Sequence, residues 1–138
     1  MPGIDDVLSA AMGIPGALGA SLVDWTSGLS LGTAGLGPHD DHETAAADTA
    51  EVAQPLARNS TFAPPGVSVG SAPANGQTTG TGPEDVIVTT GDHYHLMRFV
   101  TTDFDSRTYL YLWLDRRQAN LAIARRRLGC LALGLVAE

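Results

Sequence analysis

The chain has 138 residues, a formal net charge of −7 and one cysteine, and 43% of its residues are hydrophobic. A single cysteine excludes an internal disulfide and any metal site built from several cysteines. The acidic balance argues against nonspecific binding of nucleic acid, which depends on neutralising phosphates, and the length fits one domain with a real core.

The N-terminal sequence MPGIDDVL has neither the cationic region nor the long apolar stretch of a signal peptide. No apolar run approaches the roughly 18 residues of a membrane span. We therefore expect a cytoplasmic protein without membrane insertion. Residues 1–92 hold eleven acidic side chains against Arg58 alone, so a partner of this part would need a basic surface.

The first elements expected are a helix over residues 4–12 and a strand over residues 17–24. Both faces of this strand carry small or apolar side chains, so we expect it to be covered on both sides. The sequence DWTSG then predicts a turn in which Gly28 takes a positive φ. A second strand over residues 29–34 completes a hairpin.

The glycine-rich sequence GTAGLG, Gly32 to Gly37, follows a strand and precedes a helix, as phosphate-binding loops do. Its spacing is not G-x-G-x-x-G, and no Gly-Lys-Ser/Thr follows it. The next residues, HDDHE, place three acids at a helix N-terminus, where they satisfy its amides and repel phosphate. The pattern favours a hairpin and a capped helix over a nucleotide site.

The second helix is expected from Asp41 to Ala53 or a few residues beyond. Alanines nearly cover its surface, at positions 45, 46, 47, 50 and 53. Such a surface suits close contact with another helix, but alanine also has the highest intrinsic helix propensity. The residues alone leave both explanations open.

Residues 55–83 contain five of the eight prolines, and we expect a flexible Pro/Gly-rich insertion within one domain that spans residues 1–138. The string GVSVG around Ser68 matches the nucleophile elbow G-x-S-x-G. It lacks the strand-to-helix context that this motif needs, so we interpret it as a chance match.

The C-terminal part predicts three strands over residues 84–90, 93–100 and 108–114, followed by a helix capped by Asp115. The apolar face of this helix carries Leu121, Ala124, Leu128, Leu131 and Leu135.

The candidates for chemistry are few. His93 and His95 share a strand face, and HDDHE adds residues 39–43, but no metal-ligand spacing connects them. Arg107, in a loop beside Asp103 and Asp105, has the residue type of an arginine finger, yet pairing with its neighbours is the simpler interpretation. The arginines of the last helix fit a solvated face better than an anion-binding one. We predict no catalytic residue, no metal ligand and no cofactor.

The order helix, two strands, helix, three strands, helix resembles the roadblock (dynein light-chain) family, in its bacterial branch. Four stretches carry the resemblance: IPGALGASLVDWTSGLSLGT, ETAAADTAEV, EDVIVTTGDHYHLMR and YLYLWLDRRQANLAIARRRL. The chain is most similar to the small stand-alone roadblock proteins of actinobacteria.

The resemblance implies an α/β (α+β) fold, αββαβββα, with a five-stranded antiparallel sheet between helices. It implies the first and last helices on one face and the second helix on the other. It also implies a homodimer that binds a small Ras-like GTPase without hydrolysing anything itself. The dimer and partner residues implied are Thr44, Ala45, Ala47, Asp48, Glu51, Val52, Asp85, Val86, Ile87 and Val88.

A second hypothesis is a small-molecule sensor module of profilin-like or PAS-like shape. It needs a pocket between sheet and helices with a few convergent polar groups. The residues that would line such a pocket are His93, Tyr94, His95 and Trp113.

Overall fold

The computed structural model describes residues 3–62, 83–100 and 107–136. The elements are α1 (Ile4–Ala11), β1 (Ala17–Asp24), β2 (Leu29–Gly35), a 3-10 turn (Pro38–Asp40), α2 (His42–Arg58), a second 3-10 turn (Ser60–Phe62), β3 (Asp85–Thr89), β4 (His93–Val100), β5 (Thr108–Asp115) and α3 (Leu121–Val136). The match around Ser68 and the loop residues Asp103 and Asp105 lie outside the described residues.

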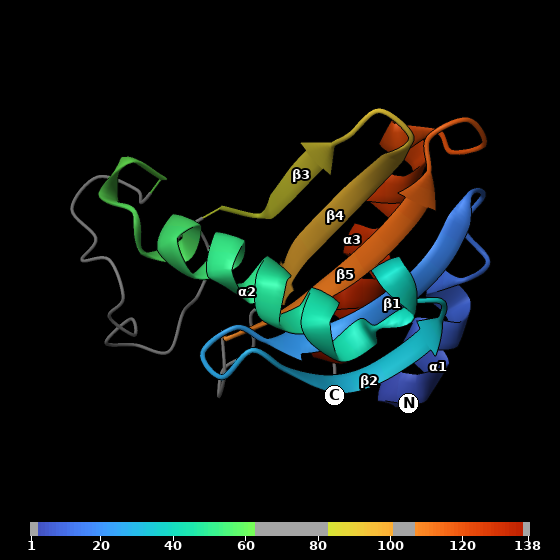
Figure 1. The fold of residues 1–138 in the computed structure, drawn as a ribbon. Helices are drawn as coiled ribbons and strands as arrows, with labels where there is room; N and C mark the ends of the chain where they lie inside the picture. Colours follow the sequence, from blue (N-terminus) through green and yellow to red (C-terminus); the bar gives the residue numbers. More distant parts are fainter. Residues whose placement is uncertain (1–2, 63–82, 101–106, 137–138) are drawn as a thin grey trace.

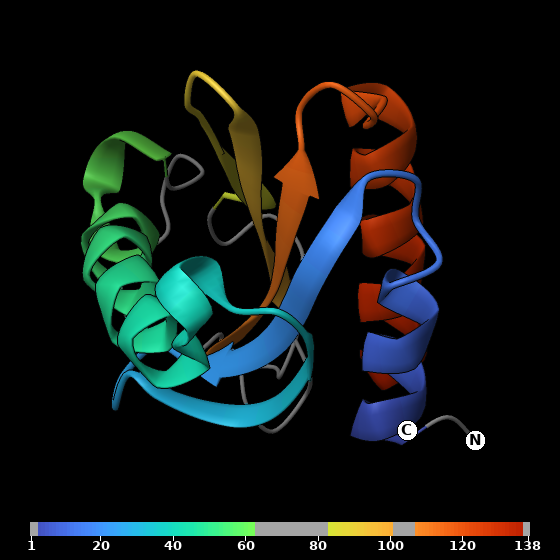
Figure 2. The same ribbon diagram turned by 45° about the vertical axis from the view of Figure 1, so that its right-hand side comes forward.

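The five strands form one antiparallel sheet in the order β2-β1-β5-β4-β3. Helices α1 and α3 lie side by side on one face of the sheet, and α2 crosses the other face (Figures 1 and 2). This arrangement confirms the expected αββαβββα fold class.

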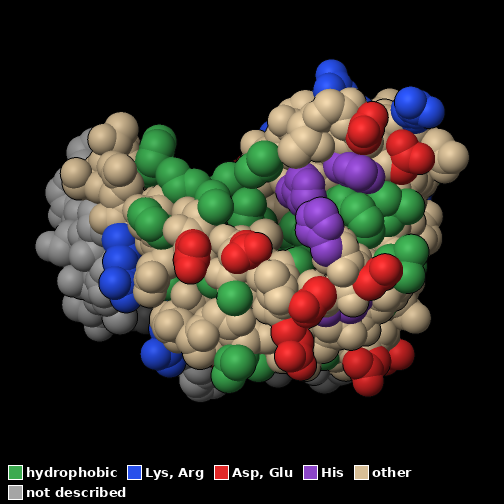
Figure 3. All heavy atoms as spheres, in the orientation of Figure 1, with side chains coloured by type: hydrophobic (Ala, Val, Ile, Leu, Met, Phe, Trp, Pro, Cys, Tyr) green, Lys and Arg blue, Asp and Glu red, His purple; other side chains and the backbone are tan. Residues whose placement is uncertain are grey.

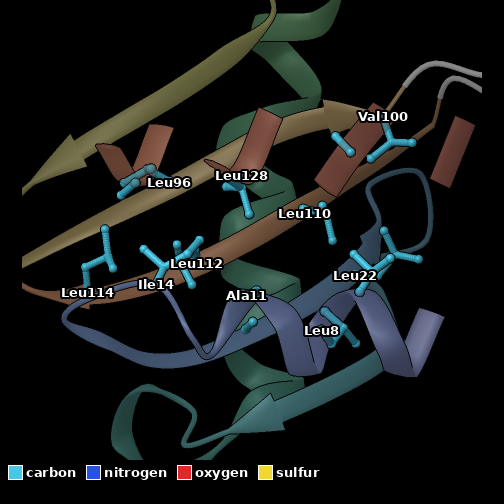
Figure 4. Close-up of a cluster of buried hydrophobic side chains, with 14 residues drawn as sticks. Leu8, Ala11, Ile14, Leu22, Leu96, Val100, Leu110, Leu112, Leu114 and Leu128 are labelled. Carbon is cyan, nitrogen blue, oxygen red and sulfur yellow. The ribbon is translucent and has the colours of Figure 1, made fainter. Parts of the chain in front are cut away.

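Leucines make the core between the sheet and the α1–α3 pair (Figure 4). Leu8 of α1, Leu112 of β5 and Leu128 of α3 are each exposed by 2% or less. Strand β1 sends Ala20 and Leu22 into this core and Val23 into a second one beneath α2. Both faces of β1 are therefore covered, as its sequence predicts.

The β1–β2 connection is a hairpin that depends on glycine at two points. Gly28 has a φ of +75°, which confirms the turn predicted there. At Gly19, an added Cβ would lie 1.7 Å from the carbonyl oxygen of Leu36. Only glycine allows the chain beyond β2 to approach β1 this closely.

The start of α3 differs from the sequence prediction. Helix α3 begins at Leu121, and its cap is Asn120, whose Oδ1 accepts the N–H of Ile123 at 3.1 Å. Asp115 instead closes a turn, where its Oδ1 accepts the N–H of Arg117 at 2.9 Å. Helix α2 continues through Pro55 to Arg58, so the start of the segment expected to be an insertion is helical.

Within the described residues, no further strand pairs with the outer edge of β2 or of β3. Strand β2 places Leu29 and Leu31 outward, with 64% and 50% of their surface exposed. Strand β3 is shorter and includes Val88, which is 37% exposed. None of the helices in the described ranges has the length and apolar character that a bilayer span requires.

Candidate functional site

The N-terminus of α2 is closed by its own side chains. Asp41 accepts the backbone N–H of Thr44 at 3.0 Å and the Thr44 hydroxyl at 2.7 Å. These hydrogen bonds hold the pKa of Asp41 below its usual value. The ring of His42 lies 3.0 Å from the Gly35 carbonyl oxygen. The amides that a phosphate would use are thus occupied by a carboxylate, which agrees with a hairpin and cap rather than a nucleotide loop.

Helix α2 has two kinds of alanine. Ala46, Ala50 and Ala53 are buried against the sheet of the same chain, with 5% or less of their surface exposed. Their small size lets α2 lie close to the sheet, so intramolecular packing accounts for them. Ala47 is exposed and Ala45 is half-buried, on other sides of the helix.

The outward surface of α2 carries the remaining residues that the resemblance implies. Thr44, Asp48 and Glu51 are exposed, and 42% of Val52 is exposed. Figure 3 shows acidic side chains along this surface, with hydrophobic ones beside them. The surface is therefore acidic with an apolar margin.

A buried tyrosine fixes the position of α2 over the sheet. The Tyr109 hydroxyl makes a short hydrogen bond to the Thr49 hydroxyl, which also donates to the Ala45 carbonyl at 2.8 Å. Burial raises the pKa of Tyr109 to about 12, so the phenol stays neutral. Since Tyr109 belongs to β5, this contact links α2 to the centre of the sheet.

The four implied residues of β3 divide between the two faces of the sheet. Val86 packs with the cluster on the α2 side, and Val88 follows it on the same face. Ile87 packs against the leucine core, and the Asp85 carboxylate accepts two hydrogen bonds from Arg125 of α3. The ion pair with Arg125 therefore attaches the start of β3 to α3 and not to α2.

A partly open strip of the sheet separates α2 from the β3 edge. Helix α2 packs mainly over β1 and β2, which leaves β3, β4 and the far end of β5 less covered. We call the side chains there the open strip: Val86, Val88, His93, His95, Phe99 and Trp113. Figure 3 shows a hollow between the C-terminal half of α2 and β3, with hydrophobic side chains along it and histidines nearby.

The histidines of the open strip are held by aromatic neighbours. The ring of His93 lies 5.0 Å from that of Trp113, and His95 Nδ1 lies 2.7 Å from the Tyr111 hydroxyl. Burial, together with the nearby His93, lowers the pKa of His95. Within the described part of the chain, no three His, Cys, Asp or Glu side chains group together as metal ligands.

The residues of the sensor hypothesis do not converge. His93, His95 and Trp113 lie on the α2 side, whereas Tyr94 packs against the leucine core on the other side, with the Arg116 guanidinium 5.7 Å from its ring. A pocket of about 670 Å³ lies elsewhere, between α1 and α3, and Tyr94 is not among its lining residues.

Sequence reasoning missed Phe99 as part of this surface. Strand periodicity places Phe99 on the same face as Met97 and His95, but Met97 is buried and Phe99 is not. The difference arises from where α2 crosses the sheet, which the strand pattern does not encode.

No protein-family model matches the chain, and no curated protein matches its sequence. Solved structures do match. MglB from Myxococcus xanthus is 20% identical with a TM-score of 0.70, over 97% of this chain and 85% of that one. A Roadblock/LC7 domain from Streptomyces avermitilis is 18% identical with a TM-score of 0.61, over 97% and 95%. The gliding protein mglB from Thermus thermophilus is 16% identical with a TM-score of 0.67, over 99% and 92%.

These matches cover nearly the whole chain, so the roadblock fold accounts for all of its elements. At this level of identity the likeness concerns the fold.

Proposed function

We propose that the chain is a non-catalytic homodimer of the roadblock type that serves in the cytoplasm as an adaptor or regulator of a small Ras-like GTPase. The observation that carries the proposal is the open strip beside an unpaired β3 edge. The strip leaves aromatic and aliphatic side chains partly exposed in one copy. The fold shared with MglB and with a Roadblock/LC7 domain supports the same interpretation.

The β3 edge can pair with a second copy. The N–H of Phe99 bonds to the Glu84 carbonyl at 3.0 Å, and the N–H of Thr90 bonds to the His93 carbonyl at 2.9 Å. Because such bonds alternate along an antiparallel ladder, the N–H groups of Asp85, Ile87 and Thr89 point away from β4. Two-fold pairing at this edge would form a continuous sheet of ten strands, five from each copy.

In that dimer, α2 and the open strip of one copy would face those of the other. The residues proposed for the dimer contact and for the partner surface together are those implied by the resemblance: Thr44, Ala45, Ala47, Asp48, Glu51, Val52, Asp85, Val86, Ile87 and Val88. The contact would cover Phe99 and Trp113, which are large aromatic side chains of the kind that dominates interface energetics.

The outward acids of α2 indicate the chemistry of the GTPase surface. Asp48 and Glu51 are exposed, and no ion pair within the described ranges involves either of them. A basic patch on the GTPase would complement them and steer the encounter. The GTPase would supply the nucleotide site, and this chain would supply the docking surface.

Dimerisation is tested by one substitution at each sheet edge. Thr89→Pro removes an outward N–H of β3 without removing a bond to β4, so sedimentation velocity should show at least about a tenfold weaker dimer. Thr33→Pro is the matched control. The Leu36 N–H bonds to the Leu18 carbonyl at 2.9 Å, so the exposed Thr33 also has its N–H outward, but on β2. Equal effects of the two substitutions would contradict pairing through β3.

Partner binding is tested by affinity capture from host lysate with GDP or a non-hydrolysable GTP analogue. Recovery of a Ras-like GTPase that is lost with Asp48→Arg/Glu51→Arg would support the proposal. Nucleotide dependence would distinguish a regulator from a scaffold. Recovery of the chain alone under both conditions would contradict GTPase binding while leaving the dimer intact.

A further inference from the structure

A pocket lies between the end of α1 and the middle of α3, the two helices on the sheet face opposite α2. Its volume is about 670 Å³. The lining residues are Ala10, Gly13, Ile14, Ile123, Arg126, Arg127, Cys130 and Leu131. The walls are thus mainly apolar, and the two arginines are the charged groups among them.

These two arginines differ from two others of the chain that form ion pairs. Arg125 pairs with Asp85, and Arg98 lies 4.0 Å from Glu84. Arg126 and Arg127 are exposed and form no ion pair with any residue in the described ranges. No acidic side chain of the described residues compensates these two positive charges at the rim of an apolar depression.

Apolar side chains share the exposed face of α3 with these cations. Ile123, Arg127 and Cys130 follow one another at helical spacings of four and three residues, so they lie on one face. Ile123 is 43% exposed, and Leu133, one further turn along, is 64% exposed. This face presents both an apolar contact and a positive charge to solvent.

We propose that the α1–α3 pocket binds a short acidic amphipathic segment of a partner protein. An apolar side chain of the segment enters between Ile14, Ile123 and Leu131, and its carboxylates pair with Arg126 and Arg127. This is the helix-in-groove mode of recognition, with charge complementarity at the rim. The pocket lies on the opposite face of the sheet from α2 and the open strip, so the inference does not depend on the proposed function.

An anionic membrane fits this surface less well. Clusters that hold proteins at such membranes contain about four to eight Lys or Arg side chains. Here two arginines stand on a chain whose net charge is −7. A concave site also favours a side chain over a flat lipid surface.

Peptide display on the immobilised full chain tests the proposal. The probe is a library of random peptides of about 12 residues, long enough for anchors at positions i, i+4 and i+7. We expect enrichment of peptides that combine Asp or Glu with Leu, Ile or Phe. Arg126→Glu/Arg127→Glu should weaken the enriched peptides at least about tenfold through charge repulsion.

Arg117→Glu is the matched control. Arg117 is exposed and lies in the turn before α3, outside the pocket. It should leave peptide affinity unchanged within about twofold. Circular dichroism and denaturant midpoints check that all variants are folded.

The sole cysteine gives an independent readout of position. A fluorophore on Cys130, which is exposed at the pocket, should change its emission when an enriched peptide binds. Peptides that bind equally to the charge-reversed protein, or that leave the Cys130 probe unchanged, would overturn the proposal. Arginine-dependent binding to vesicles of anionic phospholipid, without enrichment of acidic peptides, would overturn it as well.

Discussion

The two faces of the sheet differ in how completely helices of the same chain bury them. On the α1–α3 side, the described residues form a core of fourteen buried side chains, contributed mainly by the two helices and the sheet, and the leucines there are almost fully excluded from solvent. On the α2 side, the described residues form a smaller core of six buried side chains, contributed by α2 and the sheet, and Phe99, Trp113 and Val86 remain only partly covered. The first face completes its core within one copy. The second has an apolar margin that a second copy can cover.

The largest loss of stability is expected from the substitution of a core leucine on the α1–α3 side of the sheet. Leu112→Ala removes a fully buried side chain of β5, and the free energy of unfolding should fall by about 3 kcal/mol. Denaturant unfolding measures it, with Leu31→Ala, half exposed on β2, as the control expected within about 0.5 kcal/mol. Equal losses at both positions would contradict the division into core and surface.

A smaller loss of stability, which also depends on protein concentration, is expected from a substitution on the open strip. Phe99 is half-buried and packs edge-on against Tyr109, with ring centroids 6.3 Å apart. Phe99→Ala should cost about 2 kcal/mol, roughly half the loss for a fully buried phenylalanine. If a second copy covers this strip, the wild-type denaturation midpoint should rise with protein concentration, and this dependence should weaken in the variant. A wild-type midpoint independent of concentration would argue against that cover.

The start of α3 provides a third test, on the completed face. Asn120→Ala removes the cap that accepts the N–H of Ile123 and should cost about 1 kcal/mol. Gln118→Ala, exposed in the preceding turn, should stay within about 0.5 kcal/mol. A loss at Gln118 as large as that at Asn120 would place the helix start earlier than Leu121.

The smallest expected effect is the pH dependence from His95. Burial lowers the pKa of His95 below its ordinary value of 6.5, so the unfolded chain takes up a proton that the folded chain does not. The free energy of unfolding should therefore fall as pH drops below about 6.5, by less than about 1.4 kcal/mol per pH unit. His95→Gln should flatten this slope in denaturant titrations, and His39→Gln, which is exposed, should retain it. A slope unchanged in His95→Gln would assign the dependence to other groups.

Local pattern predicted most of the helices and strands, and the resemblance supplied their arrangement. Strands β1 and β4 begin and end at the predicted residues, and β1 lies between two turns that contain Gly16 and Gly28. The apolar face of α3 also packs as its spacing predicts. The N-cap of α3 was assigned wrongly because both Asp115 and Asn120 are residue types that suit an N-cap. Asp115 is the last residue of β5 and closes the following turn, which leaves Asn120 as the cap.

The candidate site was less predictable. The second helix was expected to end at Ala53 or a few residues beyond, and α2 ends at Arg58. Alternation along β3 separates Asp85 and Ile87 from Val86 and Val88, but the sequence does not show that Arg125 binds Asp85. The open strip depends on the crossing of α2, which tertiary packing sets. The sequence of the residues in the open strip does not indicate where α2 crosses the sheet.

The exposed edge of strand β2 would form both ends of the sheet in the proposed dimer. The proposed pairing through β3 would use one edge of each copy and would leave a β2 edge, with Leu29 and Leu31 exposed, at both ends of the joined sheet. Unpaired apolar edges are templates for further strand addition. At high protein concentration, the β2 edges of such dimers would pair with one another and lead to slow aggregation. A charged side chain at position 31 would be the simplest way to prevent this.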